Sequence, residues 1–120
     1  MIKFENVSVT YPGGVEALKD LNLEIKDGDF IIIVGLSGAG KSTLLRTVNN
    51  LVKPSTGSVY LEGKNVTSAK KKELKKIRSQ IGMIFQTFNL VNRSTVLKNV
   101  LTGRLSNIST IRSILGLWPK

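Results

Sequence analysis

The class of fold follows from one glycine-rich segment, Gly35-Leu36-Ser37-Gly38-Ala39-Gly40-Lys41-Ser42-Thr43. It matches the pattern G-x-x-x-x-G-K-[ST], in which glycines let the backbone curl around a phosphate group. The apolar and mostly β-branched residues 30–34 precede it, as in a strand buried on both faces of a parallel sheet. Residues 42–50 follow with helical spacing of apolar residues, so that a helix N-terminus adds partial positive charge to the loop.

The residue types of this loop indicate binding of a nucleoside triphosphate with Mg²⁺. Backbone N–H groups of the loop form an anion nest, and Lys41 reaches the β- and γ-phosphates. Ser42 offers a hydroxyl to Mg²⁺, and Thr43 offers a second hydroxyl near the α-phosphate. The alternative is a glycine-rich turn capped by a lysine. The candidate binding residues in the loop are Gly35, Ser37, Gly38, Ala39, Gly40, Lys41, Ser42 and Thr43.

The rest of the chain mixes strands with helices and therefore predicts an α/β fold. We expect strands at residues 2–9, with an irregularity at Glu5-Asn6, and at 21–25, 30–34, 58–61 and 81–85. Turns are expected at residues 11–14, 27–29 and 62–64. Helices are expected at residues 42–50, 70–78, 95–101 and 110–115, the first with Leu44, Leu45 and Val48 on its apolar side.

The formal net charge is +10, and its densest basic run is residues 70–78. Leu74, Ile77 and Ile81 recur there at spacings of three and four, which indicates an amphipathic helix with a solvated basic face. Binding to nucleic acid is the weaker interpretation, because no aromatic residues that could stack on bases are interleaved with the lysines.

The composition excludes several classes of protein. The chain contains no Cys and no His. A disulfide framework, a Cys/His zinc site and a Ser-His-Asp triad are therefore impossible. The longest strictly apolar run, residues 30–34, is far shorter than the roughly 20 residues that span a bilayer. We expect a cytoplasmic chain that reaches a membrane only through a partner.

The extra glycine in G-x-x-G-x-G-K-S-T resembles the Walker A loop of the ATP-binding cassette (ABC) ATPases, and the resemblance extends over the whole chain. It implies a P-loop NTPase fold with an N-terminal antiparallel β segment and the start of the parallel-sheet core. It also implies that Tyr11 stacks on adenine. Gln86, after the strand at 81–85, corresponds to the family's Q-loop glutamine. It would bind Mg²⁺ and position the attacking water, so that Lys41 and Gln86 are the catalytic candidates.

Finer similarity concerns the transported substrate. Residues 45–52, 88–101 and 102–105 look like the corresponding segments of phosphonate-import ATPases. Importers of polar amino acids and of methionine look similar through residues 88–90 and usually diverge after that point. The resemblance therefore implies uptake of phosphonate or a related small anion, with permease subunits, a substrate-binding protein and a second ATPase subunit as partners, at the cytoplasmic face of the membrane.

Three parts of the family pattern are missing from residues 1–120. They are the signature loop of the L-S-G-G-Q type, the Walker B strand and the switch histidine, all of which lie beyond position 120 in a full-length member. We therefore expect the N-terminal part of one nucleotide-binding domain, with Walker A at 35–43 and the Q-loop at 86. The full-length protein is expected to be an ATPase. The 120 residues alone are expected to bind nucleotide at most.

Other interpretations remain open. The chain could belong to an importer of another substrate, such as an amino acid, or to a soluble ABC ATPase that acts on nucleic acid. The latter usually carries long insertions or tandem cassettes, which do not occur here. A small P-loop kinase would need neither Tyr11 nor Gln86. A truncated product without a function of its own is the last alternative.

Overall fold

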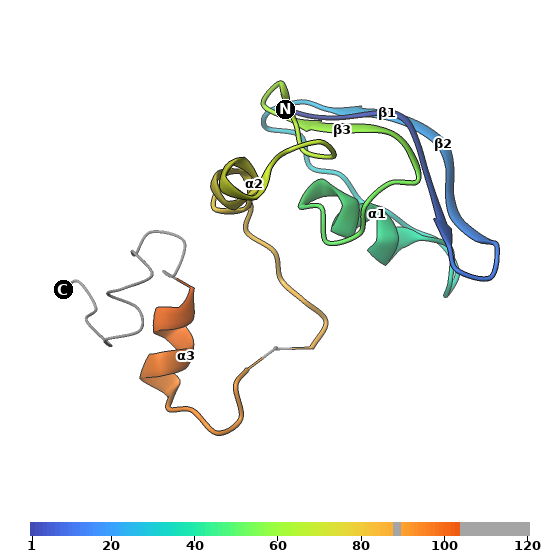
Figure 1. The fold of residues 1–120 in the computed structure, drawn as a ribbon. Helices are drawn as coiled ribbons and strands as arrows, with labels where there is room; N and C mark the ends of the chain where they lie inside the picture. The colour runs from blue at the N-terminus through green and yellow to red at the C-terminus, as the bar shows by residue number, and fades with distance from the viewer. Residues whose placement is uncertain (88–89, 104–120) are drawn as a thin grey trace. The chain divides into compact units, whose positions relative to one another are not determined.

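A four-stranded antiparallel sheet forms the N-terminal part of the computed structural model, which describes residues 1–87 and 90–103. The strands lie in the order β2-β1-β3-β4 (Figure 1). Each neighbouring pair runs antiparallel. The expected antiparallel β segment is thus confirmed, and the turn at residues 62–64 joins its last two strands. The bounds are Ile2–Tyr11 for β1, Val15–Ile25 for β2, Thr56–Leu61 for β3 and Lys64–Asn65 for β4.

A bulge in β1 explains the irregular pattern near Glu5-Asn6. Phe4 and Val7 are both buried, although residues three apart point to opposite faces of a regular strand. The pairing with β2 shifts register between these two residues, and Asn6 has a positive φ of 49°. The extra residue returns Val7 to the core face. The predicted irregularity is therefore confirmed, and its function is to keep both side chains inside.

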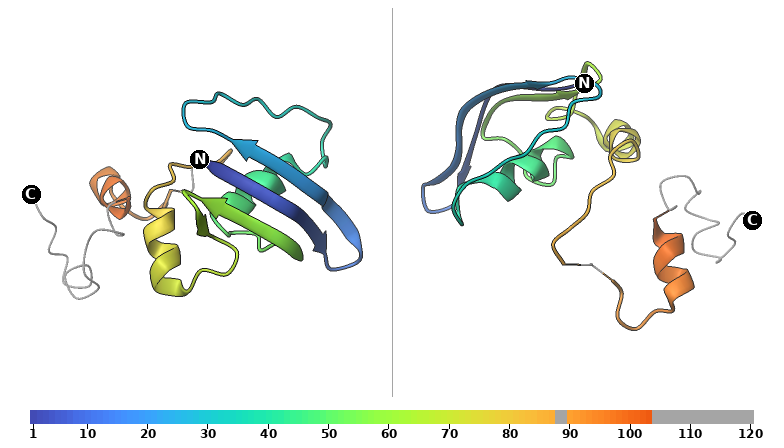
Figure 2. Two further views of the ribbon diagram at one scale, coloured as in Figure 1. Left: turned by 90° about the horizontal axis from the view of Figure 1, so that it is seen from above. Right: turned by 180° about the vertical axis from the view of Figure 1, so that it is seen from behind.

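The helix α1 (Lys41–Val48) lies against one face of the sheet (Figure 2). The helix expected at residues 42–50 is thus confirmed, but one detail of its apolar side was wrong. Leu44 is buried, whereas Leu45 is 52% exposed, and Thr43 and Thr47 complete the buried face. The apolar core of the described residues consists of Phe4, Val7, Val9, Leu44, Val59, Leu61, Val66 and Ile77.

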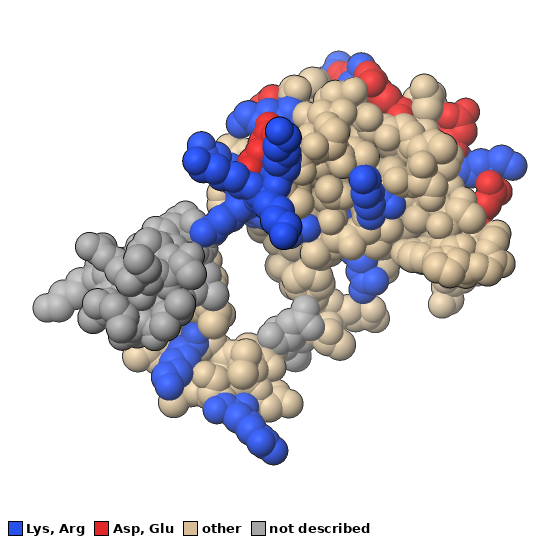
Figure 3. All heavy atoms as spheres, viewed as in Figure 1, with Lys and Arg blue, Asp and Glu red and all other residues tan. Residues whose placement is uncertain are grey.

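The basic helix α2 (Lys71–Arg78) is amphipathic, as its spacing predicted. Ile77 is fully buried in the core, while lysines gather on the outer surface of the helix (Figure 3). Arg78 connects α2 to the residues that follow α1. Its guanidinium donates hydrogen bonds from Nε to the Asn49 carbonyl at 2.8 Å and from Nη2 to the Asn50 carbonyl at 3.0 Å.

Two expected strands, at residues 30–34 and 81–85, are absent from the described residues. In the first segment Phe30 is 87% exposed and Val34 is 84% exposed, and in the second Ile84 is fully exposed. The two strand predictions, at residues 30–34 and 81–85, are therefore wrong for the described structure. A parallel strand needs hydrogen-bonded neighbouring strands and cover on both faces, and the described residues form no parallel pair of strands at these segments.

The chain divides into two compact units, residues 1–78 and 79–120. The described part of the second unit contains α3 (Val96–Thr102), which confirms the helix expected at residues 95–101. Thr95 caps this helix, because its hydroxyl accepts a hydrogen bond from the Lys98 N–H at 3.3 Å. The helix expected at residues 110–115 lies outside the described residues. No helix among the described residues is long and apolar enough to cross a bilayer.

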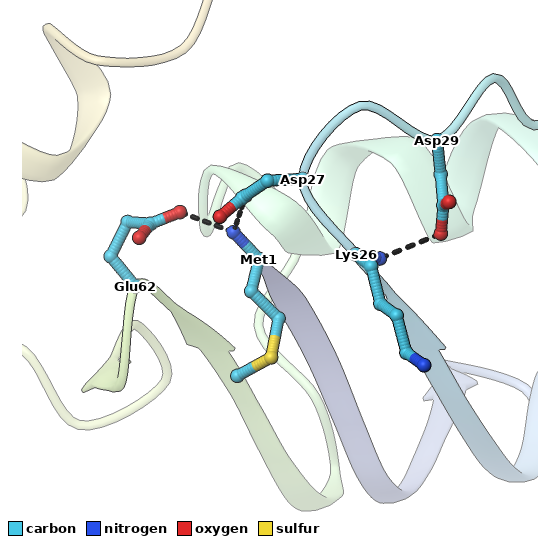
Figure 4. A network of polar contacts seen from close by, with 5 residues as sticks. All are labelled: Met1, Lys26, Asp27, Asp29 and Glu62. Carbon is cyan, nitrogen blue, oxygen red and sulfur yellow. Dashed lines mark hydrogen bonds and ion pairs between the residues drawn. The ribbon is translucent and has the colours of Figure 1, made fainter.

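The N-terminal amine connects the ends of three strands (Figure 4). Met1 precedes β1, and its amine forms ion pairs with Asp27, which follows β2, and with Glu62, which lies between β3 and β4. Hydrogen bonds to Asp27 and then Glu62 raise the pKa of the amine from its ordinary value of 8.0. The expected turn at residues 27–29 is confirmed by a hydrogen bond from the Asp29 N–H to the Lys26 carbonyl at 3.2 Å.

This network predicts a stability contribution that depends on pH. The folded chain holds the amine proton more tightly than the unfolded chain, whose amine has its ordinary pKa of 8.0. The contribution is therefore fully present below that pH and is lost as the pH rises through the folded-state pKa. We expect a small fall in melting temperature of the full chain between about pH 7 and about pH 10, weakened by salt. A chain acetylated at Met1 is the control, and an equal fall in both chains would contradict the assignment.

Candidate nucleotide-binding site

The glycine-rich loop connects residues 30–34 to α1. Within it the Ala39 N–H donates to the Leu36 carbonyl at 3.2 Å, which closes a turn. The Leu44 N–H donates to the Gly40 carbonyl at 2.8 Å, which is the first hydrogen bond of the helix. Residues 35–39 are exposed, so the loop backbone is open to a ligand.

Gly40 fixes where the loop meets the sheet. It is buried, it precedes the first residue of α1, and its φ of 83° lies in the left-handed region. A Cβ atom at this position would lie 2.1 Å from the Ala17 carbonyl oxygen on β2. No side chain fits in that space, so only glycine allows the loop to rest on the strand. The antiparallel sheet thereby positions the loop.

The N-terminus of α1 has the properties of an anion-binding site. It has no side-chain cap, and its first turn contains no acidic residue. Ser42 is exposed there, next to the half-buried Lys41. The first backbone N–H groups of a helix lack intrahelical partners and attract anions through the helix dipole. The residues present therefore fit a phosphate group, and the Ser42 hydroxyl is an oxygen donor of the kind that Mg²⁺ prefers.

Lys41 spans the loop that it belongs to. Its ammonium donates hydrogen bonds to the carbonyl oxygens of Gly35 and Leu36, both at 2.7 Å. An ammonium group has three donors, so one more remains for a phosphate oxygen. The Lys41 side chain therefore stabilises the conformation of the loop. It also brings a positive charge to the face where an anion would bind.

Tyr11 and Thr43 are brought together from distant parts of the sequence. Tyr11 ends β1, Thr43 lies in the first turn of α1, and their hydroxyl oxygens are 3.1 Å apart. Thr43 is 8% exposed, whereas Tyr11 is 38% exposed. The predicted adenine-stacking residue therefore lies beside the phosphate loop. The turn expected at residues 11–14 is confirmed by a hydrogen bond from the Gly14 N–H to the Tyr11 carbonyl at 3.1 Å.

Gln86 belongs to the second unit, where it is exposed. Its expected position next to the phosphate loop remains a prediction. Two contacts that hold the loop, those of Gly40 with Ala17 and of Thr43 with Tyr11, were not predicted from the sequence. Glycine and tyrosine were each expected to bind nucleotide, and no local pattern shows which distant residue a side chain will touch.

The fold and the glycine-rich loop are those of a nucleotide-binding protein. The sequence profile of the ABC transporter family matches residues 18–119. The chain belongs to the ABC transporter family.

Solved structures agree with this assignment. An ATP-binding cassette named MJ0796, a dimer bound to ADP and Pi, is 39% identical with a TM-score of 0.79, and the match covers 100% of this chain and 49% of that one. The protein cbiO1 of Clostridium perfringens, part of the ABC transporter complex cbiONQ, is 32% identical with a TM-score of 0.72, and the match covers 96% of this chain and 46% of that one.

Curated relatives are more similar still. The phosphonates import ATP-binding protein PhnC of Bacillus thuringiensis subsp. konkukian is 58% identical over 120 residues, which are 100% of this chain and 47% of that protein. PhnC 3 of Halalkalibacterium halodurans is 52% identical over 120 residues, 100% of this chain and 46% of that protein. The chain thus spans about half the length of these relatives.

The contact of Gly40 predicts an unequal effect of two alanine substitutions. Gly40→Ala adds a Cβ atom that meets the Ala17 carbonyl, whereas Gly38→Ala, at a similar φ of +82°, adds one with no atom within 4 Å. Both variants have the backbone cost of roughly 1–2 kcal/mol for a left-handed alanine. We expect Gly40→Ala to lower the free energy of unfolding by at least about 1 kcal/mol more, because the loop must move off β2. Denaturant titration measures this, and equal losses would show that the contact does not constrain the loop.

Proposed function

We propose that the chain is the N-terminal part, residues 1–120, of one ABC nucleotide-binding domain in the ATP-binding subunit of an importer. The observation that carries the proposal is the uncapped N-terminus of α1 behind an exposed loop, with Lys41 beside it. Such an arrangement binds the phosphates of a nucleotide without a dedicated side-chain pocket. Membership of the ABC transporter family supports ATP as the nucleotide.

Each loop residue has a role in this proposal. Backbone N–H groups of residues 35–40 surround the β-phosphate, Lys41 neutralises the β- and γ-phosphates, and Thr43 bonds the α-phosphate. Mg²⁺, when bound, neutralises phosphate charge, and Ser42 and Gln86 would hold it. The ring of Tyr11, with 38% of the residue exposed, offers a face to the adenine.

The transported substrate is proposed from the relatives. The two curated relatives described above are named as phosphonate import proteins and match the chain over its whole length. We therefore propose uptake of phosphonate or a related small anion, energised by ATP binding and hydrolysis. The subunit would act at the cytoplasmic face of the membrane, together with permease subunits, a substrate-binding protein and a second copy of the ATPase subunit.

Replacement of Lys41 tests nucleotide binding. At a MgATP concentration about 100 times Kd, binding to the native chain should add about 2.7 kcal/mol to the free energy of unfolding and raise the melting temperature by several degrees. Lys41→Ala removes a charge-assisted hydrogen bond, worth about 1.5–3 kcal/mol, and should weaken MgATP binding at least tenfold. Lys41→Arg keeps the charge and is the control. Native MgATP affinity in Lys41→Ala, measured by titration calorimetry, would refute the proposed site.

Hydrolysis is expected to be absent from the 120-residue chain. Transfer of a phosphoryl group to water needs a positioned nucleophile and charge stabilisation on every side of the γ-phosphate. Among the described residues we propose only the loop, Lys41, Ser42 and Gln86 for these tasks. They leave the γ-phosphate without charge stabilisation on every side. We expect phosphate release from MgATP to be equal for the native chain and Lys41→Ala. Steady release that disappears in Lys41→Ala would show that these residues hydrolyse ATP unaided.

A further inference from the structure

The hydroxyl of Thr43 behaves differently from that of Thr47 on the same helix. Thr47 donates a hydrogen bond to the Leu44 carbonyl at 2.7 Å, the usual arrangement for a threonine within a helix. Thr43 makes no such bond within the described residues, and its hydroxyl pairs instead with the hydroxyl of Tyr11 at 3.1 Å. The helix therefore presents Thr43 to a partner outside itself.

The chemistry of the two hydroxyls favours one direction for this hydrogen bond. Each hydroxyl has one O–H to donate and lone pairs to accept. A phenol is the more acidic of the two and is the better donor, whereas the aliphatic hydroxyl is the better acceptor. When Tyr11 donates to Thr43, the O–H of Thr43 is free to point elsewhere. Because Thr43 lies in the uncapped first turn of α1, its proton is then available to an anion at that helix end.

We propose that Tyr11 is a positioning residue whose phenolic hydroxyl holds Thr43 as a hydrogen-bond donor toward the phosphate chain of the nucleotide. The inference rests on the proposed function and adds to it, because Tyr11 then serves phosphate binding through its hydroxyl as well as adenine binding through its ring. It also ties the end of β1 to α1. The oxygen of Thr43 is held by the sheet before a phosphate arrives, which lowers the entropy cost of binding.

Binding of two different ligands distinguishes the role of the Tyr11 ring from the role of its hydroxyl. MgATP contains a base that can stack on the ring, whereas magnesium tripolyphosphate contains only the phosphates. Tyr11→Phe keeps the ring and removes the hydroxyl. We expect this variant to bind both ligands about threefold to tenfold more weakly, the range for one lost hydrogen bond. Tyr11→Ala should lose further affinity for MgATP only. If the Tyr11 ring only stacked on adenine, Tyr11→Phe would bind both ligands with native affinity, and this result would contradict the inference.

A double-mutant cycle tests whether Tyr11 acts through Thr43. Thr43→Val removes the hydroxyl with little change of shape and should weaken tripolyphosphate binding, while Thr43→Ser should restore it. In the Thr43→Val background, Tyr11→Phe should cause no further loss. Tyr60→Phe is the matched control, because Tyr60 lies on β3 and is the other tyrosine of the chain. It should bind both ligands like the native chain.

The outcomes distinguish this inference from the proposed function. If the native chain binds both ligands, Lys41→Ala binds neither and Tyr11→Phe binds both normally, the inference is overturned and the proposed function stands. If the native chain binds neither ligand, both are overturned. Thermal melts without ligand show whether each variant folds. Should Tyr11→Phe not fold, native tripolyphosphate affinity in Thr43→Val would still overturn the inference.

Discussion

The close approach of Gly40 to the Ala17 carbonyl is the constraint on which the site depends. A Cβ atom at residue 40 would lie 2.1 Å from that oxygen, so the backbone of the loop touches the backbone of β2. This contact places the start of α1 on the sheet, and the orientation of the loop follows from it. The glycine of the phosphate motif is thus needed for packing in addition to its freedom to curl around a phosphate.

α1 connects the sheet to the rest of the first unit through both of its ends. At its start Thr43 bonds Tyr11 of β1, and just beyond its end the carbonyls of Asn49 and Asn50 accept hydrogen bonds from Arg78. Asn50 also donates to the Val66 carbonyl at 3.0 Å. The helix that would bind phosphate is therefore held by polar contacts at both ends and by buried Leu44 and Thr47 between them. Such fixed geometry is what a preorganised anion site requires.

The apolar residues 30–34 show how far a strand depends on its neighbours. Their composition is that of a buried strand, yet Phe30 is 87% exposed and Ile32 is 71% exposed. Burial of a parallel strand needs partner strands on both sides and helices over both faces. The chain spans about half the length of its relatives, and its described residues contribute no partner to this segment. A composition that suits the interior thus predicts burial only where the rest of the sheet is present.

The features that depend only on neighbouring residues could be predicted from the sequence. The phosphate motif, the helices α1, α2 and α3, and the turn after Tyr11 depend on a few neighbouring residues, and the positions of these helices and of the turn were predicted correctly. The alternation in β1 even showed where the bulge must lie. The contact of Tyr11 with Thr43, 32 positions away, and the contact of Gly40 with Ala17 depend on how the chain folds and were not predictable from the sequence. A local pattern reports which face of an element is apolar, but the partner across the core is chosen by the packing of the whole unit.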